Sequence, residues 1–175
     1  MVFIIVKLIV VGLLFITFLQ DLRERAVHLF LFPLLLLGFI AISLQNNSWP
    51  VLAGNYLLNL LFLAIQIIVL YAYFSIRKGK PTAIVGVMMG WGDILFWLVT
   101  GAVFTPANYI FFFLASLIFS LFFHFLLSIV LVGEEHTKVP LAGHQALFLI
   151  FMFILQLFFP NLNFYNDSLL LESWL

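Results

Sequence analysis

Long apolar runs, separated by short polar segments, make up almost the whole chain. A helix needs about 17 to 25 apolar residues to cross the roughly 30 Å hydrocarbon core of a bilayer. We therefore predict an all-α, polytopic membrane protein with six transmembrane helices, placed near Val2–Gln20, Leu29–Leu44, Val51–Ile76, Thr82–Phe104, Ala107–Val132 and Val139–Phe159.

The composition excludes an ordinary water-soluble domain. Of the 175 residues, 66% are hydrophobic and only 8% are charged, and the mean hydropathy is +1.27. The surface of a soluble domain alone would need roughly a quarter of charged residues. We expect a single integral membrane domain over residues 1–175, in which residues 160–175 form an external tail.

Basic residues mark one side of this predicted bundle. Six of the seven Lys and Arg residues follow the first, third and fifth apolar runs, at Arg23, Arg25, Arg77, Lys78, Lys80 and Lys138. The segments after the second and fourth runs carry none. Because cytoplasmic segments are enriched in Lys and Arg, this pattern predicts that both termini lie outside.

Two acidic residues fall on the predicted cytoplasmic side. Asp93 lies inside an otherwise uncharged apolar run, directly after Gly90 and Gly92, and Asp21 ends the first run. An ionisable side chain within a membrane span is costly and usually functional. A helix that began near Ala83 would place Asp93 about 15 Å from its start, unless the glycines unwind it. We expect a small, water-accessible cavity around Asp93.

Paired carboxyl groups can share a proton, so that one accepts a proton from water while the other polarises a peptide carbonyl. This chemistry needs no metal or cofactor, and we expect neither. The chain has no cysteine, no H-E-x-x-H zinc pattern and no G-x-S-x-G nucleophile turn. Its net charge of zero predicts no nucleic-acid partner.

Other interpretations stay open at this stage. Asp21 beside Arg23 and Arg25 is also compatible with a simple interfacial charge. Asp93 could instead serve as the carrier site of a proton- or cation-coupled transporter, although no pair of runs shows the matched interruptions of an inverted repeat.

Several segments together resemble one known family. These are Gly90-Trp91-Gly92-Asp93 in the fourth run, Asp21-Leu22-Arg23-Glu24-Arg25 after the first, and Phe32-Pro33-Leu34-Leu35 in the second, with Val139-Pro140-Leu141-Ala142-Gly143 at the start of the sixth. With this order of spans, the chain resembles the type IV prepilin peptidases, a branch of the GxGD intramembrane aspartyl proteases.

This resemblance implies a function and a set of site residues. Asp21 and Asp93 would be the catalytic pair, and Gly90 and Gly92 would shape the helix start that carries Asp93. The enzyme would lie in the cytoplasmic membrane of a prokaryote and cleave pilin-like precursors between a basic leader and a hydrophobic helix. A catalytically inactive, pilin-binding relative is the alternative. N-methyltransferase activity is not expected, because the cysteine-bearing cytoplasmic segment of many bacterial relatives is absent.

A few further polar residues could contact the substrate or line the cavity. Glu24, Glu134 and Glu135 could attract a basic leader electrostatically. His28 and His144 lie near the same predicted face, although packing is a competing role for His144 and a solvated loop is a competing role for Glu134 and Glu135.

Overall fold

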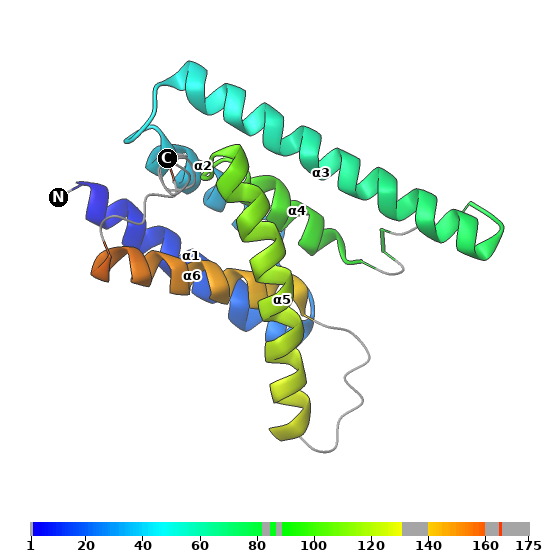
Figure 1. The fold of residues 1–175 in the computed structure, drawn as a ribbon. Helices are drawn as coiled ribbons and strands as arrows, with labels where there is room; N and C mark the ends of the chain where they lie inside the picture. The colour runs from blue at the N-terminus through cyan, green and yellow to red at the C-terminus, as the bar shows by residue number, and fades with distance from the viewer. Residues whose placement is uncertain (1, 82–84, 87–88, 131–139, 160–164, 166–175) are drawn as a thin grey trace.

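The computed structural model describes residues 2–81, 85–86, 89–130, 140–159 and 165. These residues form six α-helices and contain no β-strand, which confirms the all-α prediction (Figure 1). The helices are α1 (Val2–Glu24), α2 (Leu31–Ser43), α3 (Trp49–Lys78), α4 (Trp91–Thr100), α5 (Pro106–Val130) and α6 (Leu141–Phe158).

Five of the helices differ only slightly at their ends from the predicted runs, and the fourth differs substantially. The run predicted from Thr82 becomes helical only at Trp91. Of the residues before it, Gly86 has a φ of +81°, and its N–H donates to the Met89 carbonyl at 2.8 Å. A positive φ is readily adopted by glycine and does not occur in a right-handed helix. Asp93 therefore lies in the first turn of α4, instead of about 15 Å along a longer helix.

α1 and α6 pack against each other along much of their length and run antiparallel. Near one end, Lys7 Nζ of α1 donates to Gln156 Oε1 of α6 at 3.2 Å. Near the other end, the Gly143 N–H of α6 donates to Asp21 of α1. α2 packs on α1, α5 packs on α6, and α4 contacts both α2 and α6. Figure 1 shows α3 at the outside of this group, beside α4 and α5.

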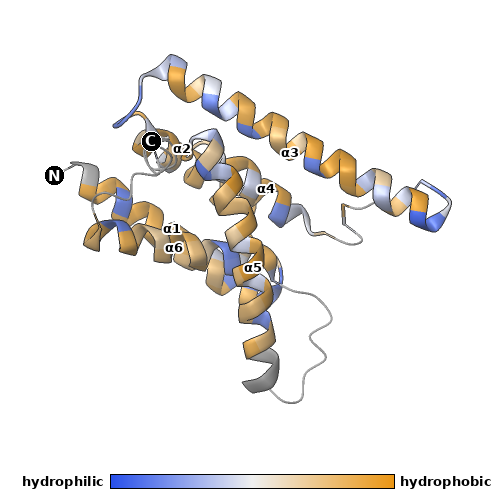
Figure 2. Ribbon diagram, in the orientation of Figure 1, coloured by the Kyte–Doolittle hydropathy of each residue, from blue (hydrophilic) through white to orange (hydrophobic). Residues whose placement is uncertain are grey.

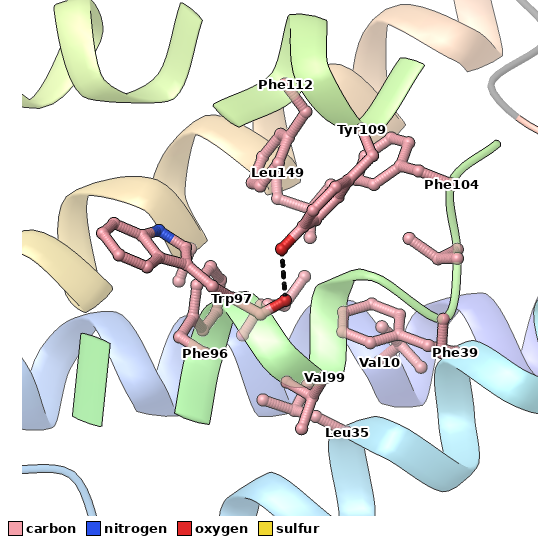
Figure 3. Packing of buried hydrophobic residues seen from close by; sticks show 14 of the residues in the cluster. Val10, Leu35, Phe39, Phe96, Trp97, Val99, Phe104, Tyr109, Phe112 and Leu149 are labelled. Atoms are coloured by element: carbon pink, nitrogen blue, oxygen red, sulfur yellow. Dashed lines mark hydrogen bonds between the residues drawn. The ribbon is translucent and has the colours of Figure 1, made fainter. Parts of the chain in front are cut away.

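A continuous apolar core joins α1, α2, α4, α5 and α6 (Figure 3). Phe39, Phe96 and Phe112 are completely buried in it. Tyr109 of α5 is also buried, and its hydroxyl donates to the Trp97 carbonyl of α4 at 2.7 Å. This bond satisfies the one polar atom of a side chain that otherwise packs like phenylalanine.

The long α3 is tied to the end of α4 by a buried asparagine. The Asn59 side-chain amide donates to the Gly101 carbonyl at 2.8 Å and to the Phe104 carbonyl at 2.9 Å. The last carbonyls of a helix have no partner within it and must find donors elsewhere. Asn59 therefore supplies a donor to the C-cap carbonyl of α4 and a second donor to the turn that follows it.

Four helices are long and apolar enough to cross a membrane: α1, α3, α5 and α6. α2 and α4 are also apolar, but at about 1.5 Å per residue they measure roughly 20 Å and 15 Å, which is less than the hydrocarbon core. Large apolar side chains are exposed along the long helices, as expected where lipid is the solvent. Hydrophilic residues gather at the C-terminal end of α3 and at the start of α4 (Figure 2).

Candidate active site

Asp93 is fixed at the start of α4. Its Oδ2 accepts a hydrogen bond from the Gly90 N–H at 3.0 Å, so Asp93 caps the N-terminus of its own helix at Gly90. Gly92 directly precedes Asp93 in the first turn of α4, and a side chain at position 92 would approach Phe32 of α2. The glycines thus lie at the helix start that carries Asp93.

Capping alone does not account for the position of Asp93. Its second oxygen, Oδ1, accepts a hydrogen bond from the Ala142 N–H at 2.9 Å. Ala142 belongs to α6, 49 residues further along the chain. Asp93 therefore joins the N-termini of two different helices.

Asp21 contacts the same turn of α6, but from α1. It is buried in the last turn of α1, with 6% of its surface exposed. Its Oδ2 accepts a hydrogen bond from the Gly143 N–H. Its other carboxyl oxygen accepts no hydrogen bond from the described residues.

The first turn of α6 thus brings the two acids together. Ala142 and Gly143 are consecutive, so their Cα atoms are only about 3.8 Å apart. The two carboxyl groups therefore accept hydrogen bonds from N–H groups one residue apart. The N–H groups of a first helical turn have no partner within the helix, and the helix dipole there favours negative charge. The end of α6 is therefore suited to hold two carboxylates.

Two side chains anchor this turn of α6 to its neighbours. Trp97 Nε1 of α4 donates to Gln145 Oε1 at 2.7 Å, one turn beyond Asp93. Ser120 Oγ of α5 and His144 Nδ1 form a hydrogen bond at 3.1 Å. Gln145 and His144 are both completely buried. The turn that holds the acids is therefore fixed from two sides.

The remaining predicted residues do not gather at this pair. The side chains of Glu24 and His28 are exposed around the end of α1. His144 was expected as a possible cavity contact, but its side chain is completely buried between α5 and α6, where Ser120 and the edge of Phe123 hold it. Glu134 and Glu135 lie outside the described residues.

The described residues offer no cluster of three or more His, Cys, Asp or Glu side chains that could hold a metal ion. What they offer is two carboxyl groups held by consecutive N–H groups of α6 within an apolar bundle. Two carboxyl groups that share a site tend to keep one proton between them, because two negative charges repel each other. One group can then act as a base and the other as an acid.

These features define a helical membrane protein with a two-acid site between α1, α4 and α6. The chain belongs to the type IV leader peptidase family, whose model matches residues 8–125. No curated protein and no solved structure matches the chain. The family match confirms the resemblance to the prepilin peptidases. It contains both acids, whereas α6 lies beyond its end.

Side-chain motifs in the sequence could not reveal the backbone contribution of α6. The partners of both acids are main-chain N–H groups, which every residue except proline carries. The one signal in the sequence was Pro140 followed by small residues at the start of the last run. That pattern indicates a helix start with room for a close neighbour, but not which neighbour.

Proposed function

We propose that this member of the type IV leader peptidase family is an aspartyl endopeptidase that removes leader peptides from type IV prepilin-like precursors. The observation that carries the proposal is the meeting of Asp21 and Asp93 on consecutive N–H groups of α6. Two acids from helices far apart in the chain converge in an apolar setting, where an unpaired charge would be costly.

The proposed chemistry uses the pair as acid and base. One carboxylate accepts a proton from a water molecule, whose oxygen attacks the carbonyl carbon of the scissile peptide bond. The other carboxyl group donates its proton toward the carbonyl oxygen. When the tetrahedral intermediate collapses, the C–N bond breaks, the leaving amine takes the proton that the first carboxylate accepted from water, and the other carboxylate takes a proton back from a hydroxyl of the intermediate. The amides of Ala142 and Gly143 hold the carboxyls in place throughout.

We propose that the site opens toward the cytoplasm in a prokaryotic inner membrane. Arg23 and Arg25 follow Asp21 directly, and Arg77 and Lys78 end α3. Figure 1 shows the C-terminal ends of α1 and α3 pointing to the same side of the molecule. By the positive-inside rule this is the cytoplasmic side. The substrate would be a precursor with a short basic leader followed by a hydrophobic helix.

The test is cleavage of such a precursor by purified protein in detergent or liposomes. Asp21→Asn and Asp93→Asn should each lower kcat by about 10²- to 10⁴-fold, the usual contribution of a general acid or base. Leu22→Ala is the control, because Leu22 is adjacent to Asp21 but exposed. An aspartate variant that folds and cleaves at the wild-type rate would remove that residue from the mechanism. A wild-type protein that binds the precursor without cutting it would contradict the proposal.

A further inference from the structure

Gly143 is the point where α6 comes closest to Asp21. A Cβ atom built on Gly143 would lie 2.9 Å from Asp21 Cβ, 3.1 Å from Asp21 Oδ2 and 3.3 Å from the Phe18 carbonyl oxygen. The first separation is shorter than real Cβ atoms tolerate, and both Asp21 Cβ and the Phe18 carbonyl are fixed to the backbone of α1. No side-chain rotation can remove both contacts.

The neighbouring residue, Ala142, shows that the requirement for a missing side chain does not extend to position 142. Ala142 carries a methyl group, is also buried, and still donates its N–H to Asp93. The contact with α4 therefore tolerates a side chain at position 142, whereas the contact with α1 does not tolerate one at 143. The same turn therefore binds both acids, with room for a side chain at the position that binds Asp93 and none at the position that binds Asp21.

We propose that Gly143 is a positioning residue: its missing side chain lets the first turn of α6 close on Asp21 and so sets the distance between the two acids. This inference rests on the proposed function and deepens it. Gly143 itself does not touch the peptide bond. It acts by placing the Asp21 carboxyl beside that of Asp93.

The anchors of α6 explain why the turn cannot move aside for a larger residue. The Trp97–Gln145 and Ser120–His144 hydrogen bonds connect α6 to α4 and α5 directly after Gly143. Moving α6 away from α1 would stretch both buried bonds. A side chain at 143 therefore displaces the end of α1, and with it Asp21, while Asp93 stays in place.

The first experiment compares Gly143→Ala with Gly12→Ala in the precursor-cleavage assay. Gly12 lies in α1, and a Cβ atom there would meet nothing within 4 Å. A misplacement of about 1 Å can cost about 100-fold in rate, so Gly143→Ala should lower kcat by roughly that factor. KM should stay unchanged, because the proposal gives Gly143 no contact with the substrate. Gly12→Ala should match the wild type in both.

Thermal unfolding in detergent separates positioning from loss of fold. Alanine favours a helix over glycine by about 1 kcal/mol, which offsets part of the strain at 143. Gly143→Ala should therefore remain folded, with an unfolding transition lowered no more than by Gly38→Ala, an overpacked variant outside the site, while kcat falls only for Gly143→Ala. A variant with normal kcat, or one in which KM rises and kcat is kept, would overturn the inference.

A second experiment tests the close approach without any cleavage. The natural chain contains no cysteine, so Asp21→Cys with Gly143→Cys places the only two thiols next to each other. Disulfides need Cβ atoms about 3.5 to 4.5 Å apart, which a small shift of α1 provides. The pair should cross-link on mild oxidation. The control, Leu22→Cys with Gly143→Cys, should not, because Leu22 faces outward.

The kinetics and the cross-linking together distinguish a failure of the positioning role from a failure of the proposed peptidase function. Cross-linking together with an inactive wild-type protein would uphold the close approach and overturn the proposed peptidase function. An active wild-type protein whose Gly143→Ala variant keeps its kcat, or whose cysteine pair does not cross-link, would overturn the positioning role and leave the peptidase function intact.

Discussion

Asn59 illustrates how single polar residues decide the structure of an apolar bundle. It is one of few buried polar side chains on α3, and its amide reaches across to two carbonyls just beyond α4. A hydrogen bond lost from such a site costs about 1 to 3 kcal/mol, because water cannot replace it easily.

Replacing Asn59 with Leu should therefore lower the free energy of unfolding by about 1 to 3 kcal/mol. The side chains are similar in size, so the change removes the donors without leaving a large cavity. Leu58→Ala is the matched control, since Leu58 is exposed on the same helix. Unfolding in mixed detergent micelles would measure both. Equal stability of the two variants would show that the Asn59 bonds contribute little.

At the residue scale the sequence singled out Asp21 and Asp93, but it did not reveal the N–H groups of α6 that bind them. Asp93 stands out because it interrupts an uncharged run, and Asp21 because it ends another. His144 looked like a possible cavity residue from its place near a helix start, yet it packs internally against Ser120 and Phe123. Which side of a helix a residue faces depends on the neighbours, and these were not known from the chain alone.

At the scale of elements, α1 and α2 approach each other very closely at Gly38. A Cβ atom built on Gly38 would overlap the side chain of Val10, which is fully buried. Small residues at helix contacts in membranes allow this kind of close packing. Because Asp21 lies on the same helix as Val10, the contact also helps to fix the end of α1.

Gly38→Ala should accordingly destabilise the protein by about 1 to 3 kcal/mol, the usual cost of an overpacked core. Gly54→Ala should leave it unchanged or slightly more stable, because a Cβ atom there meets nothing within 4 Å. The double variant Gly38→Ala with Val10→Ala should recover part of the loss caused by the overlap. Denaturation curves of the wild type, these three variants and Val10→Ala alone would test this, and additive effects of Gly38→Ala and Val10→Ala would refute the contact.

The helix boundaries show what hydropathy can and cannot predict. The five runs without internal glycine clusters closely match α1, α2, α3, α5 and α6. The fourth run was predicted too long, because an apolar turn and an apolar helix have the same hydropathy. The turn at Gly86 depends on a backbone dihedral, and the cap at Gly90 depends on a hydrogen bond that its N–H donates to Asp93; hydropathy registers neither.

For the molecule as a whole, the distribution of basic residues predicts how the protein is oriented in the membrane. Lys78 at the end of α3 should face the cytoplasm, and Asn47, between α2 and α3, should face the opposite side. Single cysteines at these positions report this directly, since the chain has none of its own. A membrane-impermeant thiol reagent applied to intact cells should label Asn47→Cys and not Lys78→Cys. The reverse pattern would invert the proposed topology.

The hydrogen bond between Asp21 and Gly143 joins residues 122 positions apart. A ribosome adds about 5 to 20 residues per second, so Asp21 is made roughly ten seconds before the turn that receives it. Asp93 is also made before that turn, so for part of the interval the nascent chain carries both acids without the N–H groups that bind them. Under the proposed function, the two acids can therefore act together only once α6 has entered the membrane.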